Sequence, residues 1–186
     1  MDKKTVLSEA DIFGTKDIRS VEKWVKRKTV KVLLRNQKNK IALITNSIHG
    51  FYLLPGGGIN ENEDIFVAAD RECQEEVNYS ITNSRILGIS EEWRARDSLQ
   101  YETNFLYAET GTYIDKDLRT NDEIANNLTV KWFSISEASE LLQNQVAELK
   151  NGRVFFYNTA FNILRDSIFL EKYKEIIKPF KNKLIN

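Results

Sequence analysis

The chain has 186 residues, of which 41% are hydrophobic, and its 27 basic and 27 acidic side chains give a formal net charge of zero. This length suits one domain with a short extension, the apolar share excludes disorder over most of the chain, and the charge balance gives no general attraction to a nucleic acid polymer or a membrane. One cysteine excludes an intrachain disulfide framework, and no apolar run reaches signal-peptide or membrane-span length, so we expect a cytoplasmic protein.

Six stretches of apolar residues, separated by polar and turn-forming residues, predict strands. They cover residues 29–35, 40–45, 51–54, 86–93, 101–108 and 128–133. Helical spacing predicts helices over residues 64–77, 137–143 and 157–177, with Ser136 as the N-cap of the second. We expect an α/β (α+β) fold in which helices surround a mixed sheet, with an amphipathic C-terminal helix. Residues 1–27 are expected to form an N-terminal appendage and residues 28–186 the domain.

The helix predicted over residues 64–77 has an apolar stripe. Phe66, Ala69, Cys73 and Val77 recur at spacings of three and four residues. Such spacing places side chains on one face of a helix, so we expect this stripe to face the core.

Beside that stripe, Glu72, Glu75 and Glu76 fall within an arc of roughly 100° on the same helix, flanked by Arg71. Like charges at this spacing repel each other, so the cluster needs a compensating cation or full solvation. Taken by itself, such a cluster indicates a solvated helix face. The turn of residues 55–58 (PGGG) favours another interpretation, because a glycine-rich turn lets backbone approach an anion or a metal. Clustered carboxylates and a backbone carbonyl are ligands that suit Mg²⁺ or Mn²⁺.

Residues 57–79, GGINENEDIFVAADRECQEEVNY, resemble the Nudix box, G-x5-E-x7-R-E-U-x-E-E-x-G-U, where U is a bulky aliphatic residue. The fixed positions that match are Gly57, Glu63, Arg71, Glu72, Glu75 and Glu76. Three positions depart from the pattern. Cys73 replaces an aliphatic residue but packs as a small hydrophobe, Asn78 replaces a glycine but tolerates a left-handed helix end, and Tyr79 stands at the last aliphatic position. None of these changes removes a charged residue of the box.

The resemblance to the Nudix hydrolase family implies a Nudix-type fold and metal-dependent cleavage of a pyrophosphate bond. Carried over by position, it implies that Glu72, Glu75 and Glu76 bind Mg²⁺ or Mn²⁺ together with the backbone carbonyl of Gly56. The same correspondence makes Glu75, Glu76 and Arg71 catalytic, with Arg71 orienting a glutamate. Gly57 and Glu63 are expected to support the cluster.

Many members of the family use a further glutamate after the box as general base or extra metal ligand. Glu123 is our candidate, although its segment also fits an ordinary polar loop. If Glu123 does not serve, the role falls to Glu91, Glu92 or Glu109, or to a metal-bound hydroxide that needs no separate base.

The expected substrate is a small nucleotide in which a nucleoside diphosphate is linked to a group X. The chain is similar to short bacterial Nudix proteins of the 8-oxo-dGTP diphosphatase type. It has no proline between Pro55 and Pro179, where ADP-ribose-cleaving relatives often carry one, and it lacks the SQPW-type motif of NADH-cleaving relatives. By elimination, nucleoside triphosphates or a small nucleotide conjugate are favoured.

Other functions considered are a catalytically inactive nucleotide-binding or regulatory module, an isoprenoid isomerase and an RNA decapping enzyme. The intact glutamate set disfavours the first, the unaltered box the second, and the absence of net positive charge the third. The oligomeric state, including a homodimer, stays open.

Overall fold

The structure is a computed structural model, and it describes residues 4–14 and 21–175. Its strands are β1 (Thr5–Ser8), β2 (Val25–Arg35), β3 (Ile41–Thr45), β4 (Tyr79–Arg94), β5 (Leu99–Tyr113) and β6 (Thr129–Phe133). Its α-helices are α1 (Glu9–Phe13), α2 (Ile65–Val77), α3 (Asn121–Ala125), α4 (Ile135–Lys150) and α5 (Tyr157–Tyr173), and a short 3₁₀ turn spans Ala95–Asp97.

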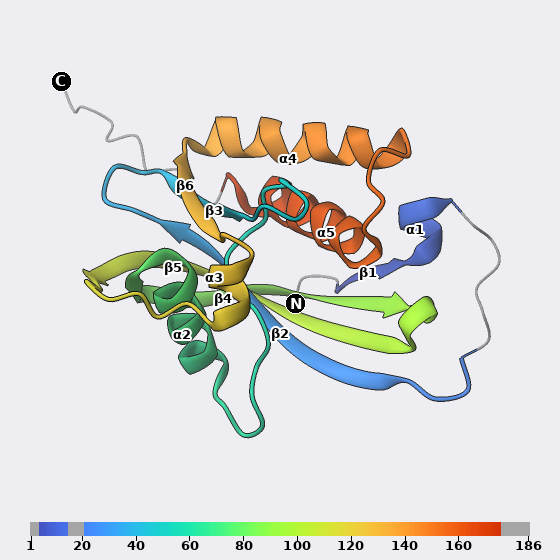
Figure 1. Cartoon of the computed structure of the whole chain (residues 1–186), viewed down its shortest axis with the longest axis horizontal. Coiled ribbons are helices and arrows are strands. Elements are labelled where there is room, and N and C mark those ends of the chain that lie inside the picture. The colour runs from blue at the N-terminus through green and yellow to red at the C-terminus, as the bar shows by residue number, and fades with distance from the viewer. Residues whose placement is uncertain (1–3, 15–20, 176–186) are drawn as a thin grey trace.

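The strands form one six-stranded sheet in the order β1-β4-β5-β2-β3-β6. The β1–β4 and β2–β5 pairs are parallel, and the other pairs are antiparallel. Figure 1 shows α2 on one side of the sheet, with α4 and α5 on the other. The predicted mixed α/β fold with helices around a sheet is therefore confirmed.

Strand β2 shows how the sequence builds the two sides of this core. Val30, Val32 and Leu34 belong to the buried cluster that includes the apolar side chains of α2. Leu33 points to the other side of the strand and belongs to the cluster that includes Phe169 of α5. Because successive side chains of a strand alternate between faces, a continuous apolar run is typical of a strand that is covered on both sides.

Helix α2 begins and ends as its sequence predicts. The side chain of Asp64 accepts a hydrogen bond from the backbone N–H of Phe66 at 2.8 Å, which caps the first turn. Asn78 ends the helix in the left-handed conformation, with φ of 62°. The Asn at the glycine position of the box is therefore compatible with the required backbone.

The predicted apolar stripe of α2 is partly wrong. Ala69, Cys73 and Val77 are buried, but Phe66 is 40% exposed, and Ala68 is buried instead. The helix is rotated so that its buried arc also includes Glu72 and Glu76. The carboxylates, and not only the apolar stripe, therefore face the interior.

Several other boundaries differ from the prediction, and β4 and β5 are both longer than expected. Residues 51–54 form no regular strand and contribute an isolated bridge between Leu53 and Ile44. Helix α4 is capped by Ser134 in place of Ser136, because the hydroxyl of Ser134 accepts from the N–H of Glu137 and completes a capping box. Helix α5 ends at Tyr173, whereas the predicted end at residue 177 lies outside the described residues.

The N-terminal segment is part of the same sheet, since β1 pairs in parallel with β4. The expected division after residue 27 falls within β2, which begins at Val25. Among the described residues, none of the helices combines the length and the apolar character needed to cross a membrane.

Candidate active site

The glycine-rich loop of residues 55–58 lies along the edge of β2. The backbone N–H groups of Val30 and Val32 donate to the carbonyl oxygens of Gly57 and Pro55, at 3.0 and 2.9 Å. Gly56 has a φ of 122°, and a Cβ at this position would overlap the carbonyl oxygen of Val30. Only glycine therefore allows the loop to approach the strand this closely.

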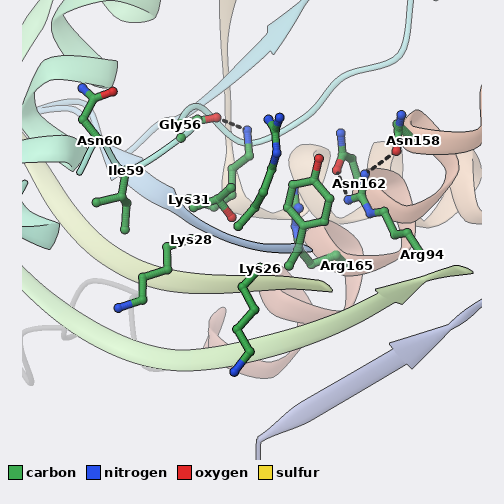
Figure 2. A pocket seen from close by; sticks show the side chains of 15 residues that line it. Lys26, Lys28, Lys31, Gly56, Ile59, Asn60, Arg94, Asn158, Asn162 and Arg165 are labelled. Atoms are coloured by element: carbon green, nitrogen blue, oxygen red, sulfur yellow. Dashed lines mark hydrogen bonds between the residues drawn. The ribbon is translucent and has the colours of Figure 1, made fainter. Parts of the chain in front are cut away.

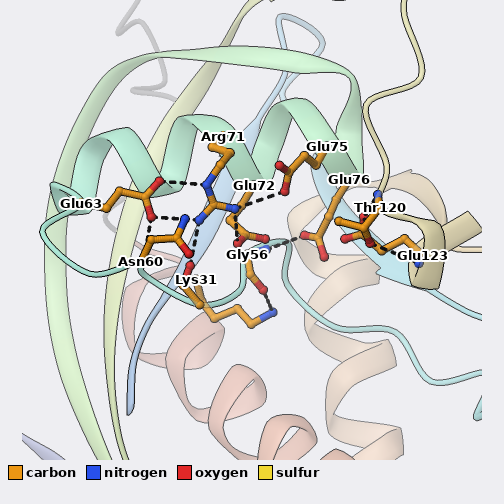
Figure 3. Close-up of polar contacts among 11 residues, drawn as sticks. Lys31, Gly56, Asn60, Glu63, Arg71, Glu72, Glu75, Glu76, Thr120 and Glu123 are labelled. Carbon is orange, nitrogen blue, oxygen red and sulfur yellow. Dashed lines mark hydrogen bonds and ion pairs between the residues drawn. The ribbon is translucent and has the colours of Figure 1, made fainter. Parts of the chain in front are cut away.

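The same loop lies directly against two carboxylates of α2. The backbone N–H of Gly56 donates to Oε2 of Glu76 at 2.6 Å. A Cβ on Gly57 would come within 2.6 Å of Oε2 of Glu72, so the lack of a side chain at Gly57 makes room for that carboxylate. Glu72, Glu76 and the glycine loop thus form one compact polar cluster (Figure 3).

Arg71 is the cation that compensates the carboxylates. Its guanidinium donates to both oxygens of Glu63, at 2.8 and 3.0 Å, and to Glu72 at 2.7 Å. It also reaches Glu75 at 3.2 Å and the carbonyl oxygen of Gly58 at 2.8 Å. These contacts lower the pKa of Glu63 to about 2 and connect the start of the box to its end. The structure thus brings the predicted charged residues of the box together.

Lys31 of β2 is a site residue that the sequence did not predict. Its side chain is buried, and its ammonium group donates to the carbonyl oxygens of Leu54, at 2.9 Å, and of Gly56. Its charge also opposes the protonation of Glu72 and Glu76. A lysine in the apolar run of β2, Val-Lys-Val-Leu-Leu, was the available signal, because a buried charge requires polar partners.

Burial sets the protonation behaviour of the two inner carboxylates. It is the main cause that raises the pKa of Glu72 above its ordinary value, and it raises the pKa of Glu76 to about 7. The neighbouring negative charges add to this effect, whereas Lys31 opposes it. The pKa of Glu76 therefore lies near neutral pH, where nearby charges decide its protonation.

Within residues 4–14 and 21–175, no three histidine, cysteine, aspartate or glutamate side chains are arranged as a metal-binding group. One oxygen of each predicted ligand carboxylate accepts from a protein donor: Glu72 and Glu75 from Arg71, and Glu76 from the N–H of Gly56. The Gly56 carbonyl accepts from Lys31. The same atoms are nevertheless hard oxygen donors of the kind that Mg²⁺ and Mn²⁺ prefer.

Glu123 lies in the first turn of α3, beside Glu76 (Figure 3). Its carboxylate accepts from the backbone N–H and the hydroxyl of Thr120, at 2.6 and 2.9 Å, which completes a capping box. Its negative charge is one of those that add to the effect of burial on the pKa of Glu76. Glu123 is therefore a half-buried carboxylate close to the cluster.

The alternative bases all have cationic partners. Glu91 pairs with Lys4, and Glu109 pairs with Arg35. Glu92 is fully buried and lies between Arg94 and Arg165. These three carboxylates serve ion pairs of the sheet and of α5, which leaves Glu123 as the candidate next to Glu76.

A pocket of about 640 Å³ opens beside the glycine loop (Figure 2). Its walls come from the first half of β2, residues 56–60 of the loop, β4, β5 and the start of α5. Behind it, Asp166 pairs with Arg165 and accepts from the backbone N–H of Leu54 at 2.9 Å. The glycine loop and the residue before it are thus held by α5 as well as by β2 and α2.

Comparison with known proteins agrees with this fold. The family model of the NUDIX domain matches residues 25–152, which is more than half of the chain. The structure is similar to that of a NUDIX hydrolase from Nitrosomonas europaea, with a TM-score of 0.53 and 19% identity, over 69% of this chain and 90% of that chain. The fold and the family match together identify the protein as a Nudix-type pyrophosphohydrolase. The chain belongs to the Nudix family, as its resemblance to the box predicts.

Proposed function

We propose that the protein is an Mg²⁺- or Mn²⁺-dependent hydrolase that cleaves the pyrophosphate bond of a nucleoside diphosphate linked to a group X. The observation that carries this proposal is the contact between two buried carboxylates, Glu72 and Glu76, and the glycine loop. Burial of carboxylates is unfavourable unless they serve a cation or are neutralised. If these glutamates only formed a solvated helix face, nothing would explain their burial.

The donor set fits a hard divalent cation. Glu72, Glu75, Glu76 and the carbonyl oxygen of Gly56 would hold it, and these are all oxygen ligands. When bound, such an ion neutralises charge on the pyrophosphate and favours attack by water. Lys31 also donates to the Gly56 carbonyl, whose second lone pair remains available to a cation.

The charged residues around the cluster position its ligands. Arg71 holds Glu72 and Glu75 through one nitrogen, and Glu63 fixes the guanidinium by accepting two hydrogen bonds from it. Paired hydrogen bonds of this kind restrict rotation as well as adding energy. Glu63 and Arg71 therefore act by orienting the carboxylates, and Gly57 acts by leaving space for Glu72.

Glu123 is proposed as the general base. In this step a water oxygen bonds to phosphorus while its proton passes to Glu123, and the bridging oxygen leaves with the other phosphate product. Glu123 is half-buried, and its carboxylate accepts hydrogen bonds only from Thr120 among the described residues. Its position beside Glu76 supports this assignment.

A substrate panel tests the proposed function. The absence of the proline and of the SQPW-type motif favours nucleoside triphosphates and small nucleotide conjugates as substrates. These compounds should release phosphate or pyrophosphate in the presence of Mg²⁺ or Mn²⁺, and a chelator should abolish the release. Melting temperature should rise with the metal ion. A protein that shows neither hydrolysis across the panel nor a metal-linked rise in melting temperature would contradict the proposal.

A further inference from the structure

The pocket beside the glycine loop has an unusual chemical composition. Fifteen described residues line it, and none of them is acidic. Its basic members are Lys26, Arg27, Lys28, Lys31, Arg94 and Arg165. The chain as a whole has no net charge, so this lining is a local concentration of hydrogen-bond donors and positive charge.

Strand geometry identifies which basic residues face α5. Arg27 is in register with Tyr101 of β5, and partners in register point to the same face of a sheet. The ring of Tyr101 lies 4.1 Å from the guanidinium carbon of Arg94, which contacts α5. Arg27 is therefore on the α5 side, whereas Lys26 and Lys28 alternate to the other face and extend away from Arg94 in Figure 2.

Arg94 orients two amides of α5. Its guanidinium donates to Oδ1 of Asn158 at 2.8 Å and to Oδ1 of Asn162 at 2.9 Å. With the oxygen committed to Arg94, the NH₂ group of each amide must point elsewhere. That of Asn158 reaches Asp97 at 3.5 Å, whereas that of Asn162 has no hydrogen-bond partner among the described residues. Asn162 thus offers an oriented donor at the pocket wall.

Buried acids neutralise the back of this wall but not its front. Glu92 pairs with both Arg94 and Arg165, and Asp166 pairs with Arg165. These two carboxylates balance the two guanidinium groups, which keeps the wall rigid without leaving an unpaired buried charge. Arg27 is exposed and is not part of any ion pair found among the described residues, so its charge is free to act on a ligand.

We propose that Arg27 and Asn162 form a subsite for a phosphate group that lies outside the pyrophosphate being cleaved. The substrate is then a nucleotide with at least one further phosphate, either in its phosphate chain or as an ester. The inference rests on the proposed function, because the glycine loop joins this subsite to the carboxylate cluster. Helix α5, which supplies the asparagine, lies beyond the residues matched by the family model.

Asn162→Asp is the most direct test. An aspartate can still accept the hydrogen bond of Arg94, so the fold is retained, but the amide donor becomes a negative oxygen. Binding of inorganic tripolyphosphate, measured by calorimetry without a divalent ion, should weaken by about 10- to 100-fold, as expected for loss of a hydrogen bond to a charged group. Arg27→Gln should have an effect in the same range. Asn144→Asp on α4, an exposed position outside this pocket, is the matched control and should bind as the wild type does.

Two substrate pairs identify where the additional phosphate belongs. ATP and ADP differ in the phosphate chain, and NADP⁺ and NAD⁺ differ by a phosphate ester. In at least one pair, the nucleotide with the additional phosphate should have the higher kcat/KM. Asn162→Asp should reduce the ratio of the two kcat/KM values by about tenfold or more. Equal preference in wild type and Asn162→Asp, or tripolyphosphate binding that is absent or unchanged by the variants, would overturn the subsite. Tripolyphosphate binding with the expected variant effects, but no hydrolysis of any nucleotide, would instead contradict the proposed function.

Discussion

Replacing Glu76 by glutamine removes a buried charge while keeping an oxygen that can accept from the N–H of Gly56. Burial raises the pKa of Glu76 from 4.5 to about 7, so its ionised form is disfavoured in the folded protein. This carboxyl contributes stability that is fully present below pH 4.5 and lost as the pH rises through 7. At about 1.4 kcal/mol per pKa unit, the loss above pH 7 is at most about 3 kcal/mol.

The metal-free Glu76→Gln protein should therefore be more stable than wild type at pH 8 by up to about 3 kcal/mol, or roughly 6–12 °C in melting temperature for a chain of this size. At pH 5 the difference should be below about 1 kcal/mol, because the buried carboxyl is then largely protonated. Turnover and the metal-linked rise in melting temperature should both be lost, since the variant lacks a ligand.

The assay is thermal melting at pH 5 and pH 8, with and without Mg²⁺, combined with pyrophosphatase activity. Glu140→Gln is the matched control, because Glu140 is an exposed glutamate on α4 outside the site. If Glu76→Gln and Glu140→Gln melt alike at both pH values, the argument from burial is wrong. If Glu76→Gln turns over as wild type does, Glu76 does not hold the metal.

Three further substitutions test separate contacts. Gly57→Ala should lower kcat at least tenfold in steady-state kinetics, because its Cβ displaces Glu72. Gly58→Ala should have a much smaller effect, because its Cβ meets no atom within 4 Å. Equal effects of the two variants would refute the steric argument. Lys31→Met should destabilise the protein by about 1.5–3 kcal/mol in urea unfolding, because two buried carbonyl oxygens lose a charged donor, and an unchanged unfolding midpoint would contradict this. Glu123→Gln should reduce kcat by about 10²- to 10⁴-fold with little change in stability, since glutamine also serves in a capping box; a decrease of less than threefold would remove Glu123 as the base.

Local sequence was sufficient to predict helix α2 and the charged residues it carries. Asp64 caps the helix and Asn78 ends it, and both act on backbone within a few residues. The spacing of Glu72, Glu75 and Glu76 follows from helix geometry alone, so their common arc needed no knowledge of the rest of the chain. The requirement for a compensating cation was also predictable, and Arg71 meets it from the same helix.

The orientation of that helix required the tertiary structure. The apolar stripe predicted that Phe66 faces the core, but the glycine loop accepts the carboxylates and rotates the buried arc toward them. Similarly, Ser134 and Ser136 are both reasonable N-caps by residue type, and the end of β6 at Phe133 places Ser134 at the start of α4. Periodicity specifies a face of a helix only to within about one residue position, and the packing partner decides the rest.

Long-range contacts decided the remainder of the site. Lys31 reaches Gly56 across 25 residues, and Asp166 reaches Leu54 across 112. Arg94 meets Asn162 only because α5 packs across β4. No local propensity encodes such pairs, since each depends on how strands far apart in the chain are ordered in the sheet. The sequence by itself therefore determined the family, the helix of the box and the carboxylates on that helix. The contacts that support the glycine loop and the basic pocket follow from tertiary packing.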